Sequence, residues 1–261
     1  MQLNYRQYSD QGEPLIILHG LFGNLANWGW HSKQFSKSFA VYGIDLRNHG
    51  DSPHAEELNF QVMAEDVREL MQRLNIDASA LIGHSMGGKV AMQLALSYPD
   101  LVSKLIVVDI APVDYPQTAA GHSNVLEGMA LLDLQQLSSR KQAERQLSEH
   151  IEDDATRKFV LTNLVRNKDG GYRWRLNLAS IRDNYDILRV KPMADKAFNK
   201  PTLFVKGALS NYIRTQNERE ILDLFPAASV KIIMQAGHWL HADRPQDFQK
   251  IAVDFLLRDE N

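Results

Sequence analysis

Residues 83–90, Gly-His-Ser-Met-Gly-Gly-Lys-Val, lie between an apolar run, "SALI", and a longer apolar stretch, "VAMQLALSY". These eight residues fit two motifs that imply different chemistry. The pattern G-x-S-x-G is typical of a nucleophile elbow, a sharp strand-to-helix turn that presents a serine. The pattern G-x-x-x-x-G-K-[ST] is typical of a loop that binds nucleotide phosphates. The stretch therefore predicts a strand, a tight turn and a helix, with Ser85 and Lys89 as rival functional residues.

Two observations favour the serine. The residue after Lys89 is Val90, which has no hydroxyl to reach the magnesium ion of a phosphate-binding loop. The serine of an elbow adopts unfavourable backbone angles, so its neighbours must be small, and Gly83 and Gly87 meet that need. We therefore take Ser85 as the candidate nucleophile. Such a serine needs a base, an acid that orients the base, and N–H donors for an oxyanion.

Six short apolar runs, each ending in turn residues, predict the strands of a central sheet: residues 14–20, 40–46, 78–84, 104–110, 202–208 and 230–237. Continuous apolar runs are typical of strands buried on both faces, as in a parallel sheet. Residues 61–74 and 245–257 show the spacing of amphipathic helices. The sequence thus predicts an α/β fold with a mostly parallel central sheet flanked by helices. Residues 3–9 suit an antiparallel edge strand.

The alternation of strands and helices stops between residues 114 and 195. The sequence there is polar, with three helical patterns and then a short extended piece, at residues 125–137, 141–151, 154–165 and 172–178. An insertion of roughly 80 residues is too long for a bare loop. We expect residues 1–113 and 196–261 to form the core, and residues 114–195 to form a helical cap over the active site.

His238 is the candidate base. In "QAGHWLHADRP", residues 235–245, it follows the last predicted strand at a turn marked by glycine. His241 comes three residues later, and a His-x-x-His pair can belong to a metal site, but no carboxylate-rich ligand set accompanies it. We favour His238 over His241 and expect neither a metal nor an organic cofactor.

The acid should lie between Ser85 and His238 in chain order. The loop after the strand at 202–208 reads "ALSNYI" and has no carboxylate. One strand earlier, "LIVVDIAP" places Asp109 at a strand end. Neighbouring strands lie about 4.8 Å apart, so this carboxylate can still reach the imidazole. We predict Asp109 as the acid, with Asp183 and Asp186 as alternatives.

Positions in the chain also predict the donors for the oxyanion and residues of the pocket wall. Met86 comes directly after the serine, and His19-Gly20 end a strand and leave the N–H of Leu21, or of Phe22, free. Three aromatic residues are candidates for the pocket wall, although ordinary packing suits each as well: Phe22, Trp174 and Trp239.

The segment 157–175 carries six cations that could meet the phosphates of a coenzyme-A thioester or form a solvated helix face, namely Arg157, Lys158, Arg166, Lys168, Arg173 and Arg175.

Composition excludes several classes of protein. The 261 residues include no cysteine, which excludes disulfides and thiolate nucleophiles. A net charge of -3 indicates no sequence-independent binding to nucleic acid. No run of about 18 apolar residues predicts a membrane span, and the first residues do not resemble a signal peptide. We expect a cytoplasmic protein whose partner is a small-molecule substrate; the oligomeric state stays open.

Five stretches resemble the α/β-hydrolase superfamily, in particular the small bacterial YbfF-type esterases: "HGLFGNLANW", "DLRNHGDSP", "GHSMGGKVAM", "VVDIAPVDY" and "AGHWLHADRP". The likeness covers residues 14–115 and 200–257 and is weaker in the expected cap. It implies an α/β-hydrolase core, an acid that maps onto Asp109 after the family's sixth strand, and hydrolysis of acyl esters or thioesters. "DLRNHGDS" implies a structural turn shaped by Asp45, Arg47 and Gly50.

Two other functions remain open on the same scaffold. A carbon–carbon bond hydrolase would use the same Ser-His-Asp triad. A binding or receptor protein could keep the triad with little turnover. Epoxide and haloalkane hydrolysis need an aspartate at the elbow, and Ser85 argues against them.

Overall fold

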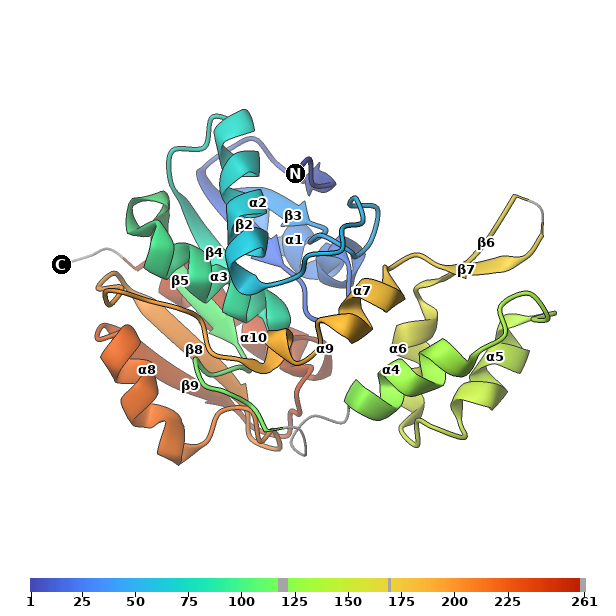
Figure 1. Ribbon diagram of the computed structural model, residues 1–261. Helices are drawn as coiled ribbons and strands as arrows, with labels where there is room; N and C mark the ends of the chain where they lie inside the picture. Colours follow the sequence, from blue (N-terminus) through green and yellow to red (C-terminus); the bar gives the residue numbers. More distant parts are fainter. Residues whose placement is uncertain (117–121, 169, 259–261) are drawn as a thin grey trace.

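The computed structural model describes residues 1–116, 122–168 and 170–258, and its core is a seven-stranded sheet (Figure 1). The strand order is β1-β3-β2-β4-β5-β8-β9. The strands are β1 (Tyr5–Gln7), β2 (Glu13–Leu18), β3 (Phe39–Ile44), β4 (Ser79–His84), β5 (Val102–Val108), β8 (Thr202–Gly207) and β9 (Ala228–Ile233). Neighbouring strands are parallel, except that β1 is antiparallel to β3. The predicted α/β fold, with its antiparallel edge strand, is confirmed.

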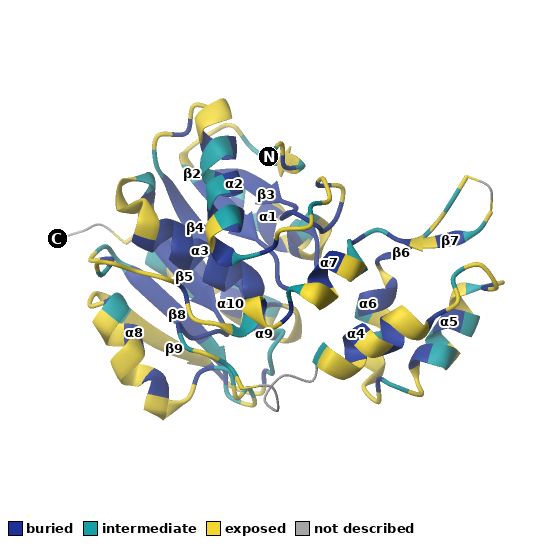
Figure 2. Cartoon of the chain, viewed as in Figure 1, coloured by how far each residue is buried: buried dark blue, intermediate teal, exposed yellow. Residues whose placement is uncertain are grey.

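Helices cover both faces of this sheet. Helices α2 (Phe60–Arg73) and α3 (Met86–Ser97) pack on one face, while α1 (Gly29–Phe35) and α10 (Pro245–Leu256) pack on the other. Successive residues of a strand point to opposite faces, and β2 therefore divides its side chains between two buried clusters. Figure 2 shows the central strands as a buried layer between partly exposed helices, whereas the edge strands β1 and β9 are mostly exposed. This three-layer packing buries both faces of the central strands and fixes the strand ends where a site can form.

The other core helices are short. They are η1 (Leu25–Trp28), η2 (Pro99–Leu101), η5 (Thr215–Asn217), α8 (Glu218–Leu224) and α9 (Leu240–Asp243). Side-chain caps fix where helices begin: the Asn59 side chain accepts a hydrogen bond from the N–H of Val62, at 2.9 Å, at the start of α2. No helix in the described part of the chain has the length and apolar character needed to cross a membrane.

Between β5 and β8 the chain leaves the sheet. We call residues 114–195 the cap segment; residues 117–121 and 169 of it lie outside the described residues. Its elements are α4 (His122–Leu131), α5 (Arg140–Leu147), α6 (Asp154–Leu161), β6 (Leu164–Arg166), β7 (Tyr172–Trp174), α7 (Leu178–Asp183) and η4 (Ile187–Arg189). In Figure 1 the helices α4–α6 and the two strands lie to one side of the core. One expectation was wrong: the helical pattern at 154–165 ends at Leu161, because residues 164–166 pair with 172–174 as an antiparallel hairpin.

Lys89 ties the two ends of the cap segment to the core. Its ammonium group donates hydrogen bonds to the carbonyl of Val113 at 2.8 Å, to that of Arg189 at 3.0 Å, and to that of Val190. Val113 lies immediately before the cap segment, and the other two lie near its end. Burial lowers the pKa of Lys89 to about 7, a shift that Asp114 partly offsets. The lysine that suggested a phosphate loop is therefore a buried structural contact.

Candidate active site

The three residues expected to act together follow three different strands of the sheet. Ser85 follows β4 and precedes α3, with φ of 52° and ψ of −118°. Asp109 follows β5, also with a positive φ of 52°. Non-glycine residues rarely adopt such angles, and they persist only where the surroundings hold them. His238 follows β9 in the turn before α9. The carboxyl edge of the parallel sheet thus brings together residues far apart in the chain.

The glycines beside Ser85 allow the elbow to form. A Cβ atom on Gly83 would strike the backbone carbonyl of Gly87, the second residue of α3. A Cβ atom on Gly87 would in turn strike the carbonyl oxygen of His19, at the end of β2. The helix therefore starts in direct contact with the strands on either side of it, and Ser85 is held at the apex of the turn.

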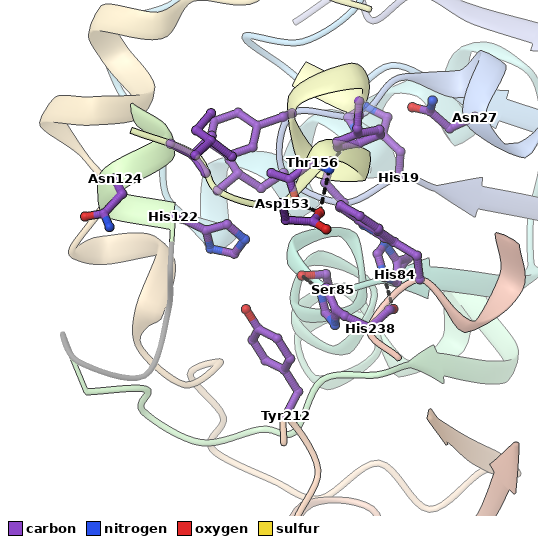
Figure 3. A pocket seen from close by; sticks show the side chains of 18 of the residues that line it. His19, Asn27, His84, Ser85, His122, Asn124, Asp153, Thr156, Tyr212 and His238 are labelled. Atoms are coloured by element: carbon purple, nitrogen blue, oxygen red, sulfur yellow. Dashed lines mark hydrogen bonds between the residues drawn. The ribbon is translucent and has the colours of Figure 1, made fainter. Parts of the chain in front are cut away.

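Hydrogen bonds join the three side chains in an unbroken series. Ser85 Oγ lies 3.0 Å from Nε2 of His238, and Nδ1 of His238 lies 2.8 Å from Oδ2 of Asp109. A neutral imidazole that donates from Nδ1 to the carboxylate keeps Nε2 as an acceptor for the serine hydroxyl. Figure 3 shows Ser85 and His238 meeting at the base of the pocket. The geometry is that required for removing a proton from Ser85.

Burial dominates the electrostatics of this series. It raises the pKa of Asp109 to about 6, against the opposing effect of hydrogen bonds from the Ser210 hydroxyl and from the N–H of Gly207 at 3.1 Å. Burial lowers the pKa of His238 to about 3. At neutral pH the imidazole is therefore uncharged and can accept a proton, and the carboxylate is ionised.

Two further contacts fix the imidazole of His238. The Tyr212 ring stacks on it, with 4.0 Å between ring centres and 25° between planes. Nε2 of His84 donates a hydrogen bond to the His238 carbonyl at 2.9 Å. Sequence reasoning missed Tyr212, and it considered Ser210 only as a residue that could not replace the acid. The one available signal was position, because both residues lie in the loop after β8, the strand next to β5 in the sheet.

Leu21 and Met86 lie where the oxyanion donors were expected. Met86 is the first residue of α3, so its N–H has no acceptor in the preceding turn of the helix. Leu21 follows β2 and lines the same cavity as Ser85. Within the described residues, the N–H groups of Leu21 and Met86 make no hydrogen bond to another protein group. The start of α3 also contributes a partial positive charge at this point.

A cavity of about 860 Å³ opens over Ser85 and His238. The core contributes apolar and aromatic side chains, among them Leu21, Phe22, Trp28 and Trp239, together with four histidines, Asn27 and Ser85. The cap segment contributes mostly polar side chains, among them Asn124, Glu127, Glu149, Glu152, Asp153 and Thr156. Figure 3 shows Asn124 on the far side of the pocket from His84, and Asp153 and Thr156 between them, above Ser85 in the view. All the carboxylates of the described lining therefore come from the cap segment.

Of the three aromatic residues expected in the wall, Phe22 and Trp239 line the cavity and Trp174 does not. Trp174 is buried within the cap segment, where its indole N–H donates a hydrogen bond to the Met129 carbonyl at 3.2 Å. That bond and the surrounding packing hold its ring away from the site.

The rival residues are engaged elsewhere. Asp183 and Asp186 are exposed and lie beside Arg182 and Arg189, at 3.8 and 3.2 Å. The His241 ring stacks on Trp28 with 4.3 Å between ring centres. Neither carboxylate is hydrogen-bonded to His238, whose Nδ1 partner is Asp109.

The six cations of segment 157–175 do not face the cavity, since none of them is among the residues that line it. Arg157 donates hydrogen bonds to the carbonyls of Ile151 and Glu152, at 2.7 and 2.6 Å. Lys158 pairs with Asp154 at 2.6 Å. Local contacts within the cap segment thus occupy two of the cations that could have met coenzyme-A phosphates.

The turn at "DLRNHGDS" is structural, as the resemblance implied. Asp45 accepts hydrogen bonds from the N–H groups of Leu25 and Asp51, at 2.7 and 2.9 Å. The guanidinium of Arg47 forms a buried two-pronged contact with the carboxylate of Asp66. Together these contacts join the loop after β2, the loop after β3 and helix α2.

The sequence matches the family described as the alpha/beta hydrolase fold over residues 13–245. The chain belongs to the α/β-hydrolase family. The hydrolase is 39% identical to the sn-1-specific diacylglycerol lipase ABHD11 of Danio rerio, over 98% of this chain and 83% of that protein. It is 33% identical to esterase YbfF of Escherichia coli (strain K12), over 94% of this chain and 95% of that protein.

A solved structure described as a marine microorganism esterase superimposes on the hydrolase with a TM-score of 0.95. The two sequences are 41% identical, and the match covers 97% of this chain and 99% of the other. Esterases and a lipase recur among these relatives. The hydrolase is accordingly an enzyme that acts on carboxylic esters.

Proposed function

We propose that the hydrolase cleaves carboxylic esters in two steps, through an acyl-enzyme on Ser85. The observation that carries the proposal is the unbroken hydrogen-bond series from Ser85 through His238 to Asp109. His238 takes the proton of Ser85 as Oγ attacks the acyl carbonyl, and Asp109 stabilises the imidazolium that forms. His238 then gives that proton to the departing alkoxide, and the alcohol leaves.

Water completes the cycle. His238 removes a proton from a water molecule as its oxygen attacks the acyl carbonyl. His238 then returns that proton to Ser85 Oγ as the bond between Oγ and the acyl group breaks and the acid leaves. In both steps the carbonyl oxygen gains negative charge, and the N–H groups of Leu21 and Met86 are the donors we assign to it. Removing one such donor typically lowers the rate by about 10²–10³. No step requires a metal or an organic cofactor.

The substrate belongs in the cavity between core and cap segment. We propose that the cap segment acts as a cap domain, because its residues line one wall over Ser85. The volume suits a small acyl ester, and a thioester of similar size would react by the same chemistry. Relatives named sn-1-specific diacylglycerol lipase make acylglycerols one class of ester to test.

The test is turnover of p-nitrophenyl acyl esters of increasing chain length by wild type, Ser85→Ala and Asp109→Asn. We expect rapid turnover by wild type, loss in Ser85→Ala, and a fall of about 10⁴ in kcat in Asp109→Asn, because an amide cannot stabilise the imidazolium by charge. The chain-length optimum measures the acyl site.

Other outcomes would redirect the assignment. Near-normal turnover by Asp109→Asn would remove Asp109 from the mechanism and return attention to Asp183 and Asp186. If wild type turned over no ester, a carbon–carbon substrate or a binding role with little turnover would replace the proposal. Trapping an acyl group on Ser85 by rapid quench and mass spectrometry would separate the two-step route from direct attack by water.

A further inference from the structure

His122 is a polar residue of the cavity that the proposed mechanism does not use. It begins α4 and lines the cavity together with Ser85 and His238. Its ring packs edge-on against Phe22 and Tyr185, with 5.9 and 6.1 Å between ring centres. Within the described residues, neither ring nitrogen makes a hydrogen bond to protein. Aromatic contacts therefore hold the ring while its hydrogen-bonding capacity stays unused.

The orientation of the ring matters as much as its position. In Figure 3 the imidazole of His122 points toward the side of the pocket where Ser85 lies. Burial, and to a smaller extent the nearby His238, lower the pKa of His122 to about 4. At neutral pH the ring is uncharged, so it offers one N–H donor and one nitrogen acceptor. Such a ring suits a hydroxyl group, which can both accept and donate.

The reaction geometry indicates which part of an ester would meet His122. The alkoxide that leaves must lie beside Nε2 of His238, which supplies its proton. His122 and His238 line the same cavity, and Figure 3 shows the His122 imidazole directed toward Ser85 and His238. Beyond the aromatic contacts of the ring, polar residues share this lining, with Asn124 on the same helix and Asp153 and Thr156 elsewhere in the cap segment. The alcohol portion of the ester is thus the portion that faces His122.

Building on the proposed acyl-transfer reaction, we propose that His122 is a positioning residue that hydrogen-bonds a hydroxyl group on the alcohol portion of the substrate. It selects esters whose alcohol carries a second hydroxyl near the ester oxygen over esters of plain alkyl alcohols. A hydroxyl that meets no partner in the cavity would lose its hydrogen bonds to water, whereas one that meets His122 replaces them.

The experiment compares two substrates of matched shape, 2-hydroxyethyl butyrate and propyl butyrate. They share the acyl group and differ in a terminal hydroxyl against a methyl group. We expect wild type to show the higher kcat/KM on 2-hydroxyethyl butyrate. His122→Phe keeps an aromatic ring between Phe22 and Tyr185 but has no donor or acceptor. It should lower kcat/KM on 2-hydroxyethyl butyrate about tenfold and on propyl butyrate less than about twofold.

Two variants separate hydrogen bonding from packing. His122→Gln keeps a donor and an acceptor and should retain part of the preference for 2-hydroxyethyl butyrate. Tyr185→Phe removes only a buried hydroxyl that has no protein partner, so it should leave both rates near wild type. Equal losses on both substrates in His122→Phe would make His122 a packing residue and overturn the proposal. Equal kcat/KM of wild type on 2-hydroxyethyl butyrate and propyl butyrate would also overturn the proposal, even if His122→Phe did not fold.

The same assay distinguishes this inference from the proposed function. If wild type hydrolyses propyl butyrate and Ser85→Ala does not, the acyl-transfer mechanism stands whatever the hydroxyl preference shows. If wild type hydrolyses neither butyrate and no p-nitrophenyl ester, the proposed function is wrong. The proposed role of His122 is then wrong as well, because it depends on that function.

Discussion

The carboxylate of Asp109 accepts hydrogen bonds from three groups: the imidazole of His238, the hydroxyl of Ser210 and the N–H of Gly207. A buried carboxylate needs such donors to remain ionised, because burial alone raises its pKa. Ser210 also fixes its own loop, since its hydroxyl accepts from the N–H of Tyr212 at 3.2 Å. We therefore treat Ser210 as a residue that acts through Asp109 rather than on the substrate.

Ser210→Ala should lower kcat by about tenfold, because it removes one of three donors and leaves the carboxylate in place. The loss should be far smaller than that of Asp109→Asn, which removes the charge itself. Measuring kcat of both variants on p-nitrophenyl butyrate shows which variant loses more activity. Circular dichroism verifies that each variant is folded. Equal losses in the two variants would mean that the hydroxyl contributes as much as the carboxylate.

The pKa shifts of the hydrogen-bonded series predict the pH profile. His238 accepts the serine proton only when it is neutral, so activity is present at high pH and is lost as His238 becomes protonated. Burial lowers its pKa to about 3, below the ordinary value of 6.5. Protonation of Asp109 near pH 6 also removes the negative charge that would stabilise the imidazolium. We expect kcat/KM to be flat above about pH 6.5 and to fall below it.

Measurement of kcat/KM from about pH 4.5 to 8.5, on a substrate without titratable groups, tests this profile. An acid limb centred clearly above the ordinary histidine value would contradict the burial argument. Thermal unfolding at each pH shows whether a loss of activity reflects unfolding instead.

At the scale of elements, helix α3 supports both the proposed nucleophile and the cap segment. Its first turn presents Ser85 and Met86, and Lys89, one turn later, reaches the carbonyls of both connections to the cap segment. The Lys89 ammonium also lies 4.9 Å from the ring centre of Tyr115, in the first connection. The position of the cap segment over the site therefore depends in part on a single buried side chain.

Lys89→Met should lower the free energy of unfolding by about 1–3 kcal/mol, because carbonyls that Lys89 satisfied would lose a buried donor. Hydrogen exchange should become faster in residues 111–115 and 187–193, where the two connections lie. Lys104→Met is a matched control, since Lys104 donates to carbonyls near the C-terminal end of α10. Unchanged exchange in both connections would show that Lys89 does not fix the cap segment.

The core could be predicted from the sequence because its signals are local. Each buried strand is a continuous apolar run, and the Gly-x-Ser-x-Gly pattern requires a tight turn at one strand end. Asp109 was predicted from its place at a strand end, and in the structure its carboxylate is hydrogen-bonded to His238. The order and register of the strands in the sheet then decide which strand ends lie side by side. That order and register follow from the fold class.

The cap segment was harder to predict because its contacts are not local. The hairpin of β6 and β7 has only three residues in each strand, which is too short for a periodic pattern. Trp174 looked suited to a pocket wall, yet a hydrogen bond to the Met129 carbonyl decides its position. His122 reaches the cavity through the packing of α4 against α7 and α5 and through its ring contact with Phe22, which no sequence pattern reports.

At the scale of the whole molecule, charge is unevenly distributed around the cavity. Four carboxylate residues of the cap segment line it: Glu127, Glu149, Glu152 and Asp153. Among the described residues that line the cavity, none is lysine or arginine. Hydrogen bonds from the hydroxyl and N–H of Thr156 lower the pKa of Asp153, so that carboxylate stays ionised. A cavity lined by one sign of charge repels ligands of the same sign.

We therefore expect neutral substrates to react faster than anionic ones that carry the same acyl group. Butyryl-coenzyme A and the butyryl thioester of N-acetylcysteamine share the reacting thioester, and only the first carries phosphates. The hydrolase should show a kcat/KM several-fold higher on the neutral thioester. Salt screens exposed charges, so raising the ionic strength should narrow the difference.

Reversing the charge of single carboxylates in the cavity lining tests whether these carboxylates disfavour the anionic thioester. Glu149→Lys and Glu152→Lys are exposed substitutions, so each should raise kcat/KM on butyryl-coenzyme A by about two- to fivefold. Neither should change the rate on the neutral thioester. Glu144→Lys, at a half-buried residue of α5 outside the cavity lining, controls for net charge alone. If all three variants gained equally on the anionic substrate, the overall charge of the protein would be responsible. If butyryl-coenzyme A were the better substrate of wild type, cations outside the described lining would have to bind the phosphates, and the acidic wall would not determine substrate charge.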